Sequence, residues 1–184
     1  VADVNGISVE INIGLGAAAG TALDFTAAPV IVATGATSGI TSFTLDFDRE
    51  IIKASAELAT FAISDFVFLQ GSFAFERTTG NAGDDGGAGF TVEALQIGGA
   101  GIDAFVGIGP FFIDSDGDGV IEATDTRSDD AMGLAIENLS FGLAIFREEG
   151  VLPANARQFL ALKAEADRAA LVGVPELTAE ISGI

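Results

Sequence analysis

Gly71-Ser-Phe-Ala-Phe-Glu76 is the stretch that decides the fold class, because its large apolar side chains occupy every second position. Ser8-Val-Glu-Ile-Asn-Ile13 has the same period of two. This spacing puts the apolar side chains on one face of a strand, whereas a helix repeats them every three or four residues. We therefore predict an all-β chain, with helix limited to short turns. The alternate apolar residues are expected to face the interior: Val9, Ile11, Phe73, Phe75, Leu143 and Ile145.

Residues 157–171 are the one segment whose composition favours a helix, since Ala, Leu, Lys, Glu and Arg are good helix formers. Two observations favour a strand instead. Leu160, Leu162 and Ala164 alternate with more polar neighbours. The segment also parallels Ile51-Ile-Lys-Ala-Ser-Ala-Glu-Leu-Ala-Thr-Phe61 through Ala161-Leu-Lys-Ala-Glu-Ala-Asp-Arg-Ala-Ala-Leu171. We predict a strand.

The chain also repeats its opening. Ala2-Asp-Val-Asn-Gly-Ile7 matches Ala179-Glu-Ile-Ser-Gly-Ile184 as alanine, acid, aliphatic, polar, glycine and isoleucine, 177 positions apart. A looser third copy of the 51–61 segment runs from Phe90-Thr-Val-Glu-Ala-Leu95 through Asp103-Ala-Phe-Val-Gly107. Self-similarity of this kind is typical of a unit from a tandem array, in which neighbouring copies bury each other's open faces. Chance similarity of a six-residue strand is the alternative.

These repeats predict that residues 1–184 form a single β repeat unit. Its strand–loop–strand modules cover about 1–65, 66–132 and 133–174, and residues 175–184 start the next repeat. We expect the modules, each a hairpin, to be stacked as an elongated β-solenoid-like repeat. A β-sandwich is the alternative.

Residues 114–125 read Asp-Ser-Asp-Gly-Asp-Gly-Val-Ile-Glu-Ala-Thr-Asp and predict a calcium site. Mutual repulsion of so many carboxylates is cancelled by a hard divalent cation with six to eight oxygen ligands. Gly119 stands at the sharp turn, and Ile121 is the apolar residue expected to anchor the loop to a core. A solvated acidic turn is the alternative. The expected ligands are the side chains of Asp114, Asp116, Asp118, Glu122 and Asp125 and the carbonyl of Val120.

The loop resembles the EF-hand calcium loop, and its closing Asp125 is similar to the dockerin variant. An EF-hand has a helix on each side, but Phe105-Val-Gly-Ile-Gly-Pro-Phe-Phe-Ile113 before the loop contains two glycines and a proline. We therefore expect a structural Ca²⁺ that ties down a long loop rather than a switch. Asp84 and Asp85 could add a second calcium site, but their glycine-rich surroundings favour a solvated turn.

Composition restricts the partners. The chain is 49% hydrophobic and has a net charge of −19, with 8 Lys and Arg residues scattered singly. Such charge repels nucleic acid and anionic membrane surfaces. The longest uncharged stretch, Phe25 to Leu45, has strand and turn composition, so no membrane insertion is expected. Cysteine, histidine, tryptophan and tyrosine are absent. An acidic, glycine-rich, cysteine-free chain with a calcium loop suggests an extracellular or bacterial cell-surface location.

Gly71–Glu76, Ala170-Leu-Val-Gly-Val-Pro175 and the embedded calcium loop resemble the tandem repeats of giant bacterial surface and secreted proteins, adhesins and RTX-like proteins among them. The resemblance implies a calcium-stabilised structural or adhesive unit of a filament or stalk. Its partners would be neighbouring copies, head to tail, with surface or matrix polysaccharide as a further partner. The nonapeptide repeats of RTX rolls are missing. A carbohydrate-binding module is the alternative, and no catalytic residue is expected.

Overall fold

The computed structural model describes residues 2–83, 87, 89–174 and 179–183. The prediction of an all-β chain is confirmed: among these residues the only helical element is the 3₁₀ turn η1 (Gly16–Ala18). No helix in the described ranges has the length and hydropathy needed to span a membrane. The predicted strand at 157–171 is confirmed as two strands, β10 (Gln158–Glu165) and β11 (Arg168–Val172), separated at Ala166 and Asp167.

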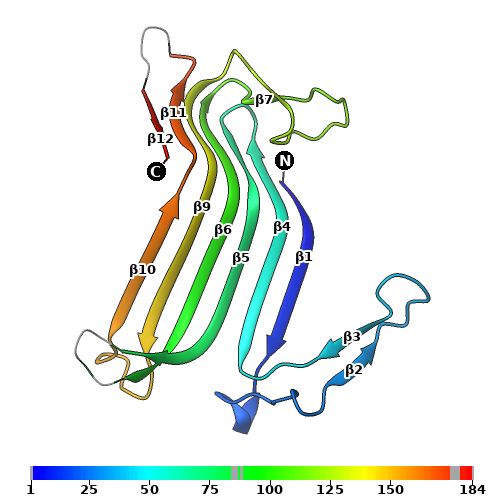
Figure 1. Ribbon diagram of the computed structural model, residues 1–184, viewed down its shortest axis with the longest axis vertical. Helices are drawn as coiled ribbons and strands as arrows, with labels where there is room; N and C mark the ends of the chain where they lie inside the picture. The colour runs from blue at the N-terminus through cyan, green and yellow to red at the C-terminus, as the bar shows by residue number, and fades with distance from the viewer. Residues whose placement is uncertain (1, 84–86, 88, 175–178, 184) are drawn as a thin grey trace.

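One eight-stranded antiparallel sheet organises the molecule (Figure 1). Its order is β1-β4-β5-β6-β9-β11-β12, and β10 pairs with a different part of the same edge of β9 as β11. The order follows the chain because each long strand turns back beside the one before it. The bounds are β1 (Ala2–Asn12), β4 (Ile51–Ile63), β5 (Val67–Ala82), β6 (Phe90–Ile108), β9 (Met132–Glu148), β10 (Gln158–Glu165), β11 (Arg168–Val172) and β12 (Glu180–Ser182).

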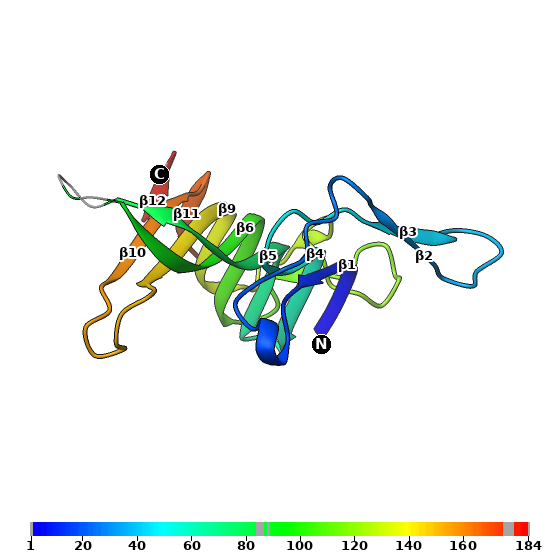
Figure 2. The same ribbon diagram turned by 90° about the horizontal axis from the view of Figure 1, so that it is seen from below.

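Two short hairpins are attached to this sheet. The first pairs β2 (Val30–Ala33) with β3 (Ser42–Leu45) and projects beyond the end of β1 (Figure 1). The second pairs β7 (Phe112–Ile113) with β8 (Thr126–Arg127) and lies near the other end of the strands. All the strands of the main sheet lie side by side in one curved layer (Figure 2). The predicted solenoid-like stacking of the three modules is therefore not confirmed, because their long strands join one sheet, and this arrangement does not exclude a β-sandwich.

The six residues predicted to face the interior do share one face of the sheet, but that face is not an interior. Residues paired across antiparallel strands point to the same side. Val9, Ala54, Phe75, Ile97 and Leu143 are linked in this way. Yet Val9 is 62% exposed and Phe75 43%. The prediction of burial was wrong because alternation assigns residues to a face and does not supply a layer to cover it.

We call this surface the open apolar face. Five cross-strand rows define it, and most of its members are large apolar residues. The rows are Ile7, Ala56, Phe73, Gly99, Phe141, Ala164; Val9, Ala54, Phe75, Ile97, Leu143, Leu162; Ile11, Ile52, Arg77, Leu95, Ile145, Leu160; Phe61, Leu69, Ala104, Ile136, Ala169, Ile181; and Ile63, Val67, Val106, Leu134, Leu171.

The hydrophobic core lies on the opposite face, which we call the covered face. Phe68 of β5 and Phe105 of β6 are 4% and 3% exposed. Phe111 and Phe112 of the β7–β8 hairpin pack onto them, with ring centroids 4.7 Å apart for Phe105–Phe111 and 5.0 Å for Phe68–Phe112. Ala131 and Ala135 complete the buried cluster. The hairpin thus covers one end of the sheet and fixes the position of the acidic loop.

Candidate metal centre

The acidic loop is the connection between β7 and β8. Ile113 pairs with Thr126 and Phe112 with Arg127, so residues 114–125 leave and re-enter one antiparallel ladder. The expectation that no helix flanks the loop is confirmed. A pair of strands holds the two ends of the loop together, which is what a pair of helices does in an EF-hand.

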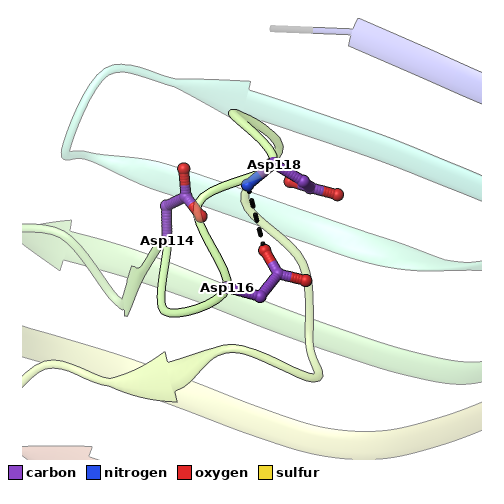
Figure 3. Close-up of side chains that lie close together, drawn as sticks. All are labelled: Asp114, Asp116 and Asp118. Atoms are coloured by element: carbon purple, nitrogen blue, oxygen red, sulfur yellow. Dashed lines mark hydrogen bonds between the residues drawn. The ribbon is translucent and has the colours of Figure 1, made fainter.

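Asp114, Asp116 and Asp118 form the acidic cluster of the loop (Figure 3). A carboxylate oxygen from each lies within 4.8 Å of the other two. Asp114 is half-buried, and the other two are exposed. The three side chains therefore present an all-oxygen donor set, which suits a hard divalent cation such as Ca²⁺ or Mg²⁺ and does not by itself distinguish them.

Backbone amides of the same loop hold these carboxylates in place. Asp114 Oδ1 accepts the Gly117 N–H at 2.7 Å, and its Oδ2 accepts the Gly119 N–H at 3.0 Å. Asp116 accepts the Asp118 N–H at 3.2 Å (Figure 3). Gly119 has φ +84°, a left-handed conformation that favours glycine and turns the chain sharply at the predicted position.

Asp125 and Glu122 lie outside this cluster. Asp125 is buried and closes the loop: its Oδ1 accepts the Ser115 N–H at 2.9 Å and the Ser115 Oγ at 3.0 Å, and its Oδ2 accepts the Glu122 N–H at 3.0 Å. These hydrogen bonds, the one from the Ser115 amide above all, hold the pKa of Asp125 below its usual value. Glu122 accepts a hydrogen bond from Thr124 Oγ1 at 2.6 Å. The Val120 N–H donates to Asp118 at 2.7 Å.

Ile121 and Ala123 pack against the hydrophobic core, which confirms Ile121 as an anchor of the loop. A polar contact beside them was not predicted. The buried Gln70 accepts the Ala123 N–H at 2.7 Å through Oε1 and donates from Nε2 to Thr60 Oγ1 at 2.8 Å. The available signal was a glutamine at the end of an otherwise apolar run, Val67-Phe-Leu-Gln70.

An ion-pair network ties the end of the loop to the last strands of the sheet. Arg127 lies 2.7 Å from Glu137, which also receives Arg168 at 2.6 Å. Arg168 in turn reaches Glu180 at 3.0 Å. Burial raises the pKa of Glu137, but hydrogen bonds from the two arginines outweigh it and leave the pKa below its usual value. The hairpin is thereby joined to β9, β11 and β12.

Asp84 and Asp85, the second candidate calcium site, lie outside the described residues. Comparison of the chain with protein families, with curated protein sequences and with solved structures finds no match. The function is therefore argued from the sheet and the loop themselves.

Proposed function

We propose that the chain is a non-catalytic structural unit of an extracellular bacterial filament or stalk, joined to neighbouring copies through the two edges of its sheet. The supporting observation is a coincidence between the sequence repeat and the strand register. Sequence similarity alone dictates neither which strands pair nor how they are aligned. Here, two segments that pair as neighbouring strands are each similar in sequence to one of two other segments. Those two also pair as neighbouring strands, with the equivalent residues opposite each other.

The first pair is β1 with β4, and the second is β12 with β11. Adding 177 to the number of a β1 residue gives its equivalent in β12, and adding 110 to the number of a β4 residue gives its equivalent in β11. Residues that pair in β1 and β4 have equivalents that pair in β12 and β11. Gly6 and Gly183, equivalent in the repeat, both have left-handed backbones, with φ +62° and +69°. The equivalent partners are Asp3–Thr60 and Glu180–Ala170, Val4–Ala59 and Ile181–Ala169, and Asn5–Leu58 and Ser182–Arg168.

The two pairs engage opposite edges of the repeated strand. β1 is at one end of the sheet and pairs with β4 through one of its edges. β12, which runs in the same direction at the other end of the sheet, pairs with β11 through its opposite edge. A strand of this type inside an array would therefore have the β11 of one unit on one side and the β4 of the next on the other. Open edges carry unpaired backbone N–H and C=O groups and readily accept such strands. Hairpins added in this way lengthen the sheet, which we favour over solenoid-like coiling.

We further propose that Ca²⁺ stabilises each unit through the 114–125 loop. The candidate ligands are the carboxylates of Asp114, Asp116, Asp118, Glu122 and Asp125 and the carbonyl of Val120. The cluster of three aspartates supports this proposal. Because Ile121 packs on the hydrophobic core, a cation bound in the loop would also stabilise the contact between the loop and the sheet. A bound cation would neutralise the loop and hold the hairpin on the covered face. The acidic, cysteine-free composition supports an exterior location, where calcium is abundant.

The test compares one, two and three copies joined so that Ser8 of the next copy follows Ile184 directly, which keeps the repeat spacing. The control joins complete copies through long Gly/Ser linkers. Shared strands predict that the melting temperature and the particle length, from solution scattering, rise with copy number only in the direct array. Equal melting temperatures for the direct and the linked arrays would contradict the proposal.

A further inference from the structure

The open apolar face is the largest feature of the molecule that the proposed function does not use. Its side chains are exposed at both margins of the sheet: Ile7 66%, Leu160 67% and Leu162 63%. The neighbouring rows on the other side of the same strands are small, polar or charged. The first of these rows is Ser8, Ser55, Ala74, Gly98, Gly142, Lys163, and the second is Glu10, Lys53, Glu76, Gln96, Ala144, Ala161. In this part of the sheet the strands are therefore amphipathic, and their apolar side is the uncovered one.

Charged side chains are nearly absent from the five rows of this face, although the chain has a net charge of −19. Among the members of its five rows, Arg77 alone is charged, and it forms an ion pair with Glu93. Glu93 belongs to the next row, Thr79–Glu93–Arg147–Gln158, which is polar. An apolar centre bounded by a polar rim is the anatomy of a protein–protein interface.

The dimensions of the face select the kind of partner. Six strands spaced about 4.8 Å apart and eleven residues rising about 3.4 Å each give a surface of about 29 by 37 Å, or about 1,000 Å². A stable interface needs about 800 Å² per partner. A helix is about 10 Å wide and would cover only about a third of the width. A second sheet of similar width covers it fully.

We propose that the open apolar face binds the same face of a second copy of this chain, forming a two-layer sandwich. The second copy has, by identity, a face of equal size and equal lack of charge. Two twisted sheets pack face to face about 10 Å apart with their strands within about 30° of each other. The contact uses the face and the proposed array uses the edges, so neither depends on the other. A second layer would also bury the apolar side chains that one copy leaves exposed on this face.

The experiment measures the mass of a single copy by sedimentation equilibrium from micromolar to millimolar concentration. The double variant Phe75→Lys/Leu162→Lys places charge on the open apolar face. The matched control Ala74→Lys/Ala161→Lys places the same charge one residue away, on the other face. Both changes make the chain less acidic, so weakened association of the first cannot arise from greater repulsion between copies. Thermal unfolding of both variants in dilute solution checks their folding.

We expect the unchanged chain and the control to form a discrete two-copy species that is favoured by added salt, because salt screens the repulsion between acidic copies. The open-face variant should show at least a hundredfold weaker association. Mass that stays at one copy throughout, growth into open-ended aggregates, or equal weakening by both variants would overturn the proposal.

A second measurement does not depend on the lysine variants folding. Because the chain contains no cysteine, single Leu162→Cys and Ala161→Cys variants can be compared by their rates of reaction with a thiol reagent. Rising protein concentration should slow the reaction of the first at least tenfold and leave that of the second unchanged. If rising protein concentration slowed the reactions of Leu162→Cys and Ala161→Cys equally, or slowed neither, the face contact would be overturned. Failure of the joined copies to gain stability would overturn only the edge-to-edge array.

Discussion

The two faces of the sheet are built from the same strands and have opposite fates. On β5, Phe68 points to the covered face and is 4% exposed, while Phe75 points to the open apolar face and is 43% exposed. The difference comes from outside the strand. Phe111 and Phe112 of the β7–β8 hairpin pack on Phe68 on the covered face, whereas none of the described residues covers Phe75 on the open apolar face in this way. Burial is thus a property of the covering segment, and the stability of one copy should reside on the covered face.

Truncating one phenylalanine on each face should give the largest contrast. Phe68→Ala removes a ring from a closed cluster and is expected to cost about 3–5 kcal/mol of unfolding free energy. Phe75→Ala, half-exposed in a single copy, should cost about 1 kcal/mol. Urea unfolding in dilute solution measures both values. Equal losses would show that the open apolar face is already covered within one copy.

Raising the protein concentration sharpens the same comparison. If two copies stack through their open faces, the cost of Phe75→Ala should grow with concentration, because association adds to the stability of the folded state. The cost of Phe68→Ala arises within one copy and should not change with concentration to the same degree. A cost of Phe75→Ala that is constant across concentrations would count against stacking.

Gln70→Ala tests the polar contact between the sheet and the hairpin. It leaves the half-buried Ala123 N–H and the buried Thr60 hydroxyl without their partner and should cost about 1–3 kcal/mol in urea unfolding. The control is Gln96→Ala, an exposed glutamine on the same face of the sheet, which should change stability by less than about 0.5 kcal/mol. Similar effects of the two changes would mean that the contact does not hold the hairpin.

The sequence predicted which residues form strands and which share a face, because both follow from a period of two within a segment. It predicted the loop at residues 114–125 and the role of Ile121 from a different local signal, the spacing of the acidic residues with Gly119 and Ile121. It did not predict that Phe75 would be exposed, since no local pattern states whether a second layer exists. Nor did it predict that Asp125 would accept backbone N–H groups, because spacing identifies a carboxylate without naming its partner.

Calcium should act on the covered face alone, through the hairpin. At free Ca²⁺ ten times its dissociation constant, a site present only in the folded state stabilises it by about 1.4 kcal/mol. Asp116→Ala should abolish this gain, while Asp129→Ala, just outside the loop, should keep it. Calorimetric titration and thermal unfolding with Ca²⁺, Mg²⁺ or a chelator measure it. No heat and no shift at millimolar Ca²⁺ would rule out the site, and equal shifts with both ions would rule out selectivity.

The smallest expected effect is an acid sensitivity of the loop that comes from Asp125. Its pKa is lowered in the folded chain, so the unfolded chain, with a pKa of about 3.9, binds the proton more readily. The stability that this carboxylate contributes is therefore present above about pH 4 and is lost as the pH falls through the folded pKa. Asp125→Asn should be more destabilising at neutral pH than in acid.

This pH dependence should be measured with a chelator present, so that competition between protons and a metal does not contribute to it. Ser115→Ala provides an internal comparison, because it removes the hydroxyl donor and keeps the two backbone donors from Ser115 and Glu122. Since the amide of Ser115 is the largest cause of the lowered pKa, the alanine variant should retain most of the acid sensitivity. A complete loss of that sensitivity in Ser115→Ala would show that the hydroxyl, and not the loop backbone, sets the charge state of Asp125.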